Sequence, residues 1–486
     1  MAQSYDGPIE KIDDYHYRIP ADARRGMRAD GLIFADEKLL ELIKDDATLS
    51  QVANVACLPG LVGSAMAMPD AHQGYGFPIG GVAAFDVNDG VMSPGGVGYD
   101  INCGVRLMRS DLRVDDIEDS LEDLADALFS RVPAGVGKSG QFKVSKNDLQ
   151  EVLRKGAAWA VSEGYGENGD LDHCEGGGFL EGADPSALSK RAMDRGAPQL
   201  GTLGSGNHFL EIQRVQRIQD PDAARAFGIE ETGQVCVMIH CGSRGLGHQV
   251  CDDAVDTMLK AASRYGIELP DKQLACAPVD SPEADEYYSG MACAANYAWA
   301  NRQVITHQVR EAFQRTLRAG PNQLGLRLVY DVAHNVAKFE EHDVDGTPTR
   351  LCVHRKGATR GFGPGHPEVP DDYRDYGQPV LIPGDMSTGS FVLTGTDRAM
   401  TDSWGSTCHG AGRVMSRNAA TKRAHSNQVA AKLQDEGVVV RSVGKKTLAE
   451  EAPYAYKVVD DVVDVCAGAG ISKVVARLMP LAVIKG

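Results

Sequence analysis

The sequence lacks several features that would assign it to a familiar class at once. Only 6% of its 486 residues are aromatic, and no apolar run approaches the roughly 18 residues that a membrane span requires. The first twenty residues are acidic and polar, with neither the charged-then-apolar layout of a signal peptide nor an Arg- and Ser-rich transit pattern. We therefore expect a soluble globular protein of the cytoplasm that does not engage a membrane.

The chain also lacks paired cysteines and an excess of basic residues. Its eleven cysteines include no CxxC pair, and this odd, scattered set suits a reducing compartment rather than a disulfide framework. The formal net charge is −17, which disfavours binding of nucleic acid by the whole surface, because phosphates are neutralised by Lys and Arg. Any RNA or DNA site must be local, and a divalent metal would supply the missing positive charge.

Glycine, in contrast, is abundant. The 55 glycines gather in blocks without a fixed period, so a solenoid or propeller is not expected. Several blocks follow short strand-like runs, at 235–239, 326–332 and 379–382. Amphipathic helical patterns lie between them, at 116–132, 291–317 and 460–470, and a polar stretch at 166–185 is predicted to be a long loop. This mixture without strict βαβ order predicts an α+β fold, one domain over 1–486, with a site in loops at strand ends.

Five potential metal ligands lie in or beside the glycine blocks. A single thiol, three imidazoles and a carboxylate form a borderline-soft set, which would hold Mn²⁺, Zn²⁺, Co²⁺ or Fe²⁺ better than Mg²⁺. Five ligands exceed one tetrahedral site, so two metals sharing a ligand would fit, a geometry that serves phosphoryl transfer. Each histidine taken alone could equally be a hydrogen-bonded residue at a strand end. The candidate ligands are Asp100, Cys103, His208, His240 and His334.

A second candidate is His409 in "SWGSTCHGAGR" (403–413). Small residues on both sides let another molecule approach the imidazole, which indicates an accessible nucleophile. Arginines suited to phosphate lie nearby in sequence or beside other glycine blocks. They are Arg244, Arg413 and Arg417. Two lysines next to glycine, Lys356 and Lys485, are further cations, although a lysine next to the C-terminus is usually frayed unless the preceding "LAVI" forms a strand.

Taken together, these motifs closely resemble the RtcB family of GTP-dependent RNA ligases, and they occur in the family's order. The resemblance covers about residues 31–486. The motifs that carry it are "GVGYDINCGVR", "GTLGSGNHFLEIQ", "IHCGSRGLGHQV", "VYDVAHNVAK", "HRKGATRG", "HGAGRVMSR", "EAPYAYKVVDDVVDV" and "VIKG". It implies a single large domain with mixed and antiparallel sheets surrounded by helices.

The resemblance also implies a reaction. Such a ligase joins an RNA 3′-phosphate, or a 2′,3′-cyclic phosphate opened first, to a 5′-hydroxyl in tRNA splicing or RNA repair. The matching nucleophile, His409, would attack GTP and become a histidine–GMP. The GMP would pass to the RNA 3′ end as RNA-3′-pp-5′-G, which the 5′-hydroxyl then attacks. An archease-type activator is a further partner that the family allows.

Individual positions carry over from the resemblance. Cys103 would be shared by two Mn²⁺ ions, with Asp100 and His208 on one ion and His240 and His334 on the other. Arg244 and Arg413 would act beside His409, and Arg195 and Arg417 would contact RNA phosphates. The positions expected to hold GTP are Asn207, Glu211, Lys356, Ser390, Tyr456 and Lys485, of which Glu211 and Lys485 would read the guanine.

Two departures from the family pattern and two other functions stay open at this point. Cys241 and Asp385 both stand where the family usually has serine; the thiol would be an oxidation liability if exposed, and the carboxylate would repel a triphosphate. The alternative functions are a metal-dependent phosphohydrolase, which has no use for His409 as a nucleophile, and a non-catalytic RNA-binding protein.

Overall fold

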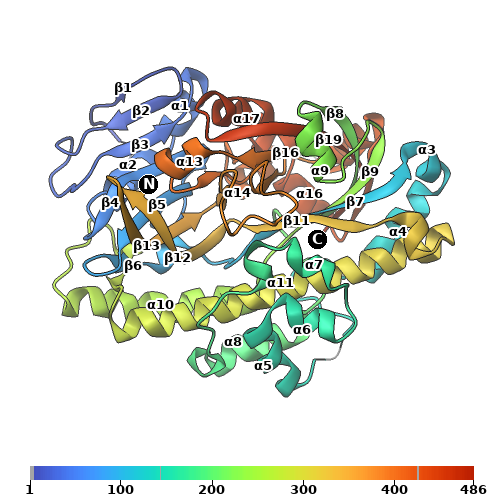
Figure 1. Ribbon diagram of the computed structural model, residues 1–486, viewed down its shortest axis with the longest axis horizontal. Helices are drawn as coiled ribbons and strands as arrows, with labels where there is room; N and C mark the ends of the chain where they lie inside the picture. Colours follow the sequence, from blue (N-terminus) through green and yellow to red (C-terminus); the bar gives the residue numbers. More distant parts are fainter. Residues whose placement is uncertain (1–4, 143, 424–425) are drawn as a thin grey trace.

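The computed structural model describes residues 5–142, 144–423 and 426–486. Most of its strands belong to a seven-stranded and an eight-stranded sheet. The long helix α11 (Pro282–Leu317) runs along the lower side of the view in Figure 1, with α10 (Arg244–Arg264) beside it. Ser281 caps α11 and Pro282 occupies its first turn, which is why the helix starts before the predicted 291.

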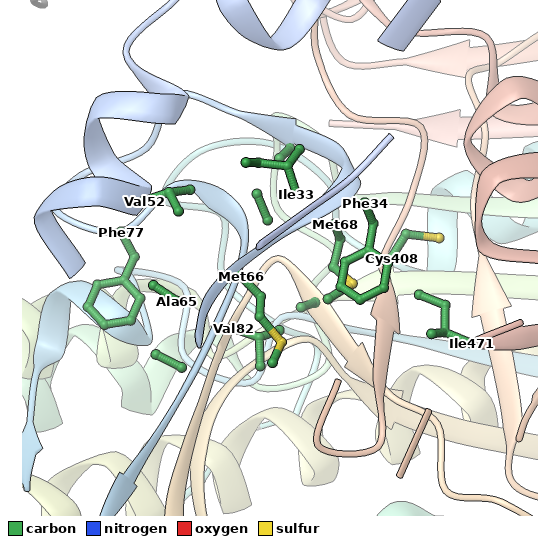
Figure 2. Close-up of a cluster of buried hydrophobic side chains, with 14 of the residues drawn as sticks. Ile33, Phe34, Val52, Ala65, Met66, Met68, Phe77, Val82, Cys408 and Ile471 are labelled. Carbon is green, nitrogen blue, oxygen red and sulfur yellow. The ribbon is translucent and has the colours of Figure 1, made fainter. Parts of the chain in front are cut away.

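The first sheet is antiparallel except where β3 meets β4. In spatial order its strands are β1 (Glu10–Lys11), β2 (His16–Ile19), β3 (Gly31–Phe34), β4 (Leu61–His72), β5 (Ile79–Asp86), β13 (Thr347–Lys356) and β12 (Asn335–Val344). Figure 2 shows apolar side chains of β3, β4 and β5, among them Phe34, Met66 and Val82, in one cluster with Cys408. The residue before His409 is therefore anchored in this core.

The second sheet is antiparallel apart from β18 (Val439–Ser442), which pairs in parallel with β19. Its other strands, in spatial order, are β11 (Arg327–Ala333), β7 (Gly104–Arg113), β9 (Gln234–Cys241), β8 (Phe209–Ile218), β19 (Ser472–Lys485), β16 (Ser390–Gly395) and β15 (Pro379–Ile382). The β11 strand leads through His334 into β12, so the chain crosses between the two sheets at that histidine.

Two short strand pairs and a set of smaller helices complete the described elements. The pairs are β6 (Val91–Met92) with β10 (Ala277–Pro278), and β14 (Ala358–Arg360) with β17 (Ser406–Cys408). The remaining α-helices are α1 (Glu37–Lys44), α2 (Thr48–Val55), α3 (Val114–Ile117), α4 (Leu121–Arg131), α5 (Lys146–Lys155), α6 (Ala157–Ser162), α7 (Gly169–Asp172), α8 (Lys190–Gly196), α9 (Pro221–Ala226), α12 (Pro321–Leu324), α13 (Asp397–Asp402), α14 (Arg417–Arg423), α15 (Ser426–Asp435), α16 (Lys445–Glu450) and α17 (Val459–Gly468).

The structure confirms the α+β class and most of the predicted elements. The strand-like runs at 235–239, 326–332 and 379–382 fall within β9, β11 and β15. The pattern at 116–132 is divided between α3 and α4. The stretch at 166–185 is not a plain loop, since it contains α7 and a 3₁₀ turn at Glu175–Gly178. Asp170 of α7 is buried and accepts hydrogen bonds from Arg310 of α11, a contact that fixes this segment.

The C-terminal "LAVI" lies in β19, so Lys485 is not frayed: it is buried, with 3% of its surface exposed. Among the residues described, no helix is long and apolar enough to cross a membrane. The cytoplasmic location and the single domain over 1–486 stay predictions.

A buried ion cluster connects the second sheet to α11. Asp331 of β11 accepts a hydrogen bond from Arg106 Nε at 2.6 Å and from Arg302 Nη2 at 2.8 Å, and all three side chains are fully buried. Arg302 Nη1 also donates to the carbonyl oxygens of Asn102 and Cys241, each at 2.8 Å. The cluster therefore ties together α11, β7, β9, β11 and the segment before Cys103.

Replacing Asp331 by alanine should destabilise the fold strongly. The change leaves two guanidinium groups buried without their carboxylate, which costs about 3–5 kcal/mol of unfolding free energy. Chemical denaturation of Asp331→Ala and wild-type protein measures the difference. Arg225→Ala is the control, because Arg225 forms an exposed pair with Asp222 and exposed pairs contribute little. Equal denaturation midpoints for Asp331→Ala and wild type would contradict the assignment.

Candidate active site

The candidate metal ligands lie at one edge of the second sheet. The strand register places Gly104 opposite both Cys241 and Ala333, and Phe209 opposite both His240 and Lys485. Because neighbouring strands are antiparallel, one edge of the sheet contains the first residues of β7 and β8 and the last residues of β9, β11 and β19. The candidate ligands flank these ends: Cys103, His208, His240 and His334.

The side chains form two groups of three that share Cys103. One group is Cys103, His240 and His334, the other Asp100, Cys103 and His208, and the ligand atoms within each group lie within 4.8 Å of one another. Cys103 Sγ is 3.2 Å from His240 Nε2 and 3.4 Å from His208 Nε2. A central thiol with imidazoles and a carboxylate fits two borderline-soft ions better than Mg²⁺.

Neighbouring groups orient these ligands. His208 Nδ1 lies 3.0 Å from the carbonyl oxygen of Leu203, which can accept its proton, and His208 Nε2 lies 2.7 Å from Asp100 Oδ2. This is the kind of support that fixes the ring of a metal-binding histidine. His334 Nδ1 is buried and has no hydrogen-bond partner among the described residues. Its other nitrogen, Nε2, faces His240 Nε2 at 3.3 Å.

Burial sets the protonation of the site. It lowers the pKa of His240 and His334 well below the usual value, an effect to which His409 adds, so both rings are neutral and able to bind a metal. Burial and then Asp100 raise the pKa of the Cys103 thiol to about 11. Without a nearby cation the thiol therefore stays protonated at neutral pH. A bound metal ion would remove this proton, because a thiol that coordinates a metal is deprotonated.

A cavity of about 960 Å³ opens over this centre, at the upper end of the range for ligand pockets. Nearly all of the predicted site residues line it: Asp100, Cys103, Arg195, Asn207, His208, Glu211, His240, Arg244, His334, Lys356, His409, Arg413, Arg417, Tyr456 and Lys485. Ser390 is the exception. It is buried outside the lining and accepts a hydrogen bond from Gln213, whose amide also donates to Glu211.

His409 follows β17 and faces the cavity, with its ring centroid 4.8 Å from that of His334. Its Nδ1 lies 2.5 Å from Asp70 Oδ2, and the same oxygen accepts the backbone N–H groups of His409 and Gly410. Burial alone would raise the pKa of Asp70, but the contact with His409 outweighs this effect and lowers the pKa below its usual value. Asp70 is thus an ionised acceptor that directs the opposite nitrogen, Nε2, away from itself.

Arg413 and Arg417 share one buried carboxylate, Glu451. Arg413 Nη1 donates to Glu451 Oε2 at 3.0 Å, Arg417 Nε donates to Oε1 at 2.9 Å, and the Tyr456 hydroxyl contacts the same group. Burial opposes the shift, but Lys485, Arg417 and Arg413 lower the pKa of Glu451 to about 2. Two guanidinium groups at the cavity wall therefore share one buried carboxylate.

Another carboxyl of the cavity lining, Glu211, lies near the buried cation Lys485. Burial, to which Asp385 adds, raises the pKa of Glu211 to about 7, although Lys485 opposes the shift. The Asp385 carboxylate accepts the backbone N–H groups of Ser387 and Thr388, so it stabilises its own turn. This explains how a carboxylate is accommodated at the cavity wall.

The remaining predicted residues occupy distinct positions. Arg244 has a positive φ of 54°, unusual for a residue with a side chain, and its guanidinium lies 3.1 Å from the His208 ring. Lys356 donates to the carbonyl oxygen of Phe77 at 3.1 Å. Cys241 is fully buried and donates to the carbonyl oxygen of Leu203. It does not line the cavity. The thiol is therefore not exposed, and exposure was the condition under which oxidation was expected.

The fold and the cavity define a class of α+β protein in which two groups of thiol, imidazole and carboxylate side chains that could hold metal ions open into a pocket large enough for a nucleotide. The chain belongs to the RtcB family, since the family model described as tRNA-splicing ligase RtcB matches residues 51–486. Relatives named tRNA-splicing ligase RtcB include those of Archaeoglobus fulgidus, 58% identical, and Thermococcus kodakarensis, 53% identical, with 99% of each chain covered in both cases. RNA-splicing ligase RtcB homolog 1 of Entamoeba dispar is 50% identical over 99% of this chain and 91% of its own.

Replacing Cys103 by alanine should lower the metal content of the protein, because Cys103 belongs to both groups of ligands. Elemental analysis after loading with Mn²⁺ and desalting measures the ions bound per chain. Cys236→Ala is the matched control, since Cys236 is an equally buried thiol on β9, outside both groups. Equal metal content in Cys103→Ala and the control would remove the shared-ligand role.

Proposed function

We propose that this chain is a GTP- and Mn²⁺-dependent RNA ligase that joins 3′-phosphate or 2′,3′-cyclic phosphate ends to 5′-hydroxyl ends, in tRNA splicing or RNA repair. The observation that carries the proposal is the contact between His409 and Asp70 at the wall of a cavity that also contains the thiol–imidazole centre. Membership of the RtcB family and the names of the relatives support the same reaction.

The first step uses His409 as the nucleophile. The ionised Asp70 carboxylate lies 2.5 Å from Nδ1 of His409 and favours the proton on that nitrogen, so the lone pair of Nε2 attacks the α-phosphorus of GTP. The new N–P bond forms as the bond from the α-phosphorus to the bridging oxygen breaks, and pyrophosphate leaves. Arg244 and Arg413 stabilise the charge that develops on the phosphate oxygens. The product is the histidine–GMP.

The cavity wall provides the nucleotide site. Glu211 and Lys485 would read the guanine edge, and Asn207, Lys356 and Tyr456, which line the same cavity, would contact the rest of the nucleotide. Ser390 supports Glu211 indirectly through the amide of Gln213. Asp100, Cys103 and His208 would hold one Mn²⁺ ion, and Cys103, His240 and His334 the other. When bound, these ions supply positive charge to the phosphate oxygens.

The later steps consume the RNA ends. An oxygen of the RNA 3′-phosphate attacks the histidine-bound phosphorus, which breaks the N–P bond and gives RNA-3′-pp-5′-G. The 5′-hydroxyl then attacks the RNA phosphate, forms the phosphodiester and releases GMP; a 2′,3′-cyclic phosphate is first opened by water. Arg195 and Arg417, both on the cavity wall, would contact RNA phosphates. An archease-type activator is a proposed partner.

The decisive test is protein labelling by GTP that carries its label on the α-phosphate, in the presence of Mn²⁺. Wild-type protein should acquire a label that acid removes and alkali spares, as expected of a phosphoramidate, and His409→Ala should acquire none. His366→Ala, which changes a histidine outside the cavity, is the control and should label normally. If wild type does not label and phosphatase activity survives in His409→Ala, the metal-dependent phosphohydrolase replaces the ligase.

GTP binding should strengthen as the pH rises through about 7, the pKa of Glu211. Below that value the carboxyl is protonated, whereas above it the carboxylate accepts the N–H groups of guanine. The fraction ionised, and hence the affinity, should increase by up to about tenfold between pH 6 and 8. Calorimetric titration with GTP measures the change. Glu211→Gln should bind more weakly and without this slope, and an equal slope in the variant would contradict the role of Glu211.

A further inference from the structure

Lys457 is a buried cation behind the cavity, in the segment that follows Tyr456. Only 3% of its surface is exposed. Its Nζ donates to the carbonyl oxygens of Pro69 at 2.9 Å and Ala71 at 2.6 Å. These two residues flank Asp70 in β4, so the ammonium holds the backbone on both sides of the residue that contacts His409.

The backbone of Lys457 holds the other side of the same contact. Its N–H donates to the carbonyl oxygen of Gly412 at 2.9 Å, in the glycine turn that carries His409. Gly412 has φ +71° and packs so closely that a Cβ there would lie 2.1 Å from the carbonyl oxygen of Asp70. One residue thus connects the strand of Asp70 and the turn of His409, which are far apart in the sequence.

The charge of Lys457 matters as well as its geometry. Burial lowers its pKa to about 8, with Asp70 opposing the shift, so the side chain is mostly cationic at neutral pH. Lys457 in turn lowers the pKa of the Asp70 carboxyl, after the larger contribution of His409. Lys457 does not belong to the cavity lining. It therefore acts on the ring of His409 through Asp70 and through the two backbone segments.

We propose that Lys457 is a positioning residue for His409: its ammonium and its backbone N–H fix Asp70 and the glycine turn, so that Nε2 of His409 is held toward the cavity. The proposal rests on the proposed function, in which Nε2 attacks GTP. It predicts that loss of Lys457 slows the covalent step while the guanine end of the cavity, formed by Glu211 and Lys485, is undisturbed.

The test compares single-turnover labelling by GTP in wild type, Lys457→Met and Lys457→Arg. Lys457→Met should label about 10- to 100-fold more slowly at saturating GTP, because a small displacement of a reacting group costs this much, with the GTP concentration for half-maximal rate changed less than twofold. Lys457→Arg, which retains the charge and donors, should recover part of the rate. Lys338→Met is the control: Lys338 is another buried lysine, bound to Glu175 at 2.6 Å, and its loss should affect thermal stability more than labelling.

A second readout needs no nucleotide. Diethylpyrocarbonate modifies unprotonated imidazole nitrogens, and mass spectrometry follows the modification of His409 in each variant. Slower modification in Lys457→Met than in wild type and Lys338→Met supports the proposal. An equal or faster rate, or equal labelling of Lys457→Met and wild type, overturns it. If wild type acquires no label, the ligase assignment fails, and the rate of His409 modification alone decides the role of Lys457.

Discussion

The contact on which the rest of the site depends is that of the Arg302 guanidinium with Asp331. Its Nε and Nη2 bind the carboxylate, and its Nη1 holds the carbonyl oxygens of Asn102 and Cys241, which adjoin Cys103 and His240. Asn102 has a positive φ of 50°, so this segment is held in a conformation that a side-chain-bearing residue seldom adopts. A buried ion pair is weak evidence for stability; here it sets the separation of two ligand-bearing segments.

Patterns of local sequence predicted much of this fold, because they report burial within one element. The apolar run at 235–239 lies in β9, fully buried on both faces, and the helix at 460–470 matches α17. The segment at 166–185 was predicted less well, because its order comes from a contact of Asp170 with Arg310, remote in sequence. The spatial order of the strands, in which β19 lies between β8 and β16, also depends on contacts that no local pattern encodes.

The same limit separates the site residues that the sequence indicated from those it missed. His409 was recognisable from its small neighbours, and the candidate ligands from the glycine blocks beside them. Asp70 was missed because "AMPDAHQG" carries no mark of its contact with His409, 339 residues away. Glu451 was missed for the same reason, although its acidic neighbourhood in "LAEEAPYAY" precedes Tyr456 closely. Ser390, predicted at the nucleotide site, is buried and is connected to Glu211 through the amide of Gln213, a contact that the sequence motif does not encode; its role in binding GTP stays a prediction.

The cavity gathers basic side chains although the chain as a whole is acidic. The net charge is −17, yet the cavity brings Arg413 and Arg417 together on the buried carboxylate of Glu451. Because that carboxyl has a pKa of about 2, it remains ionised at neutral pH and holds both guanidiniums in place before any phosphate arrives. A phosphate that binds there, as we propose, would meet guanidinium groups that are already held in place, and at physiological ionic strength the charges of the distant exposed surface are largely screened.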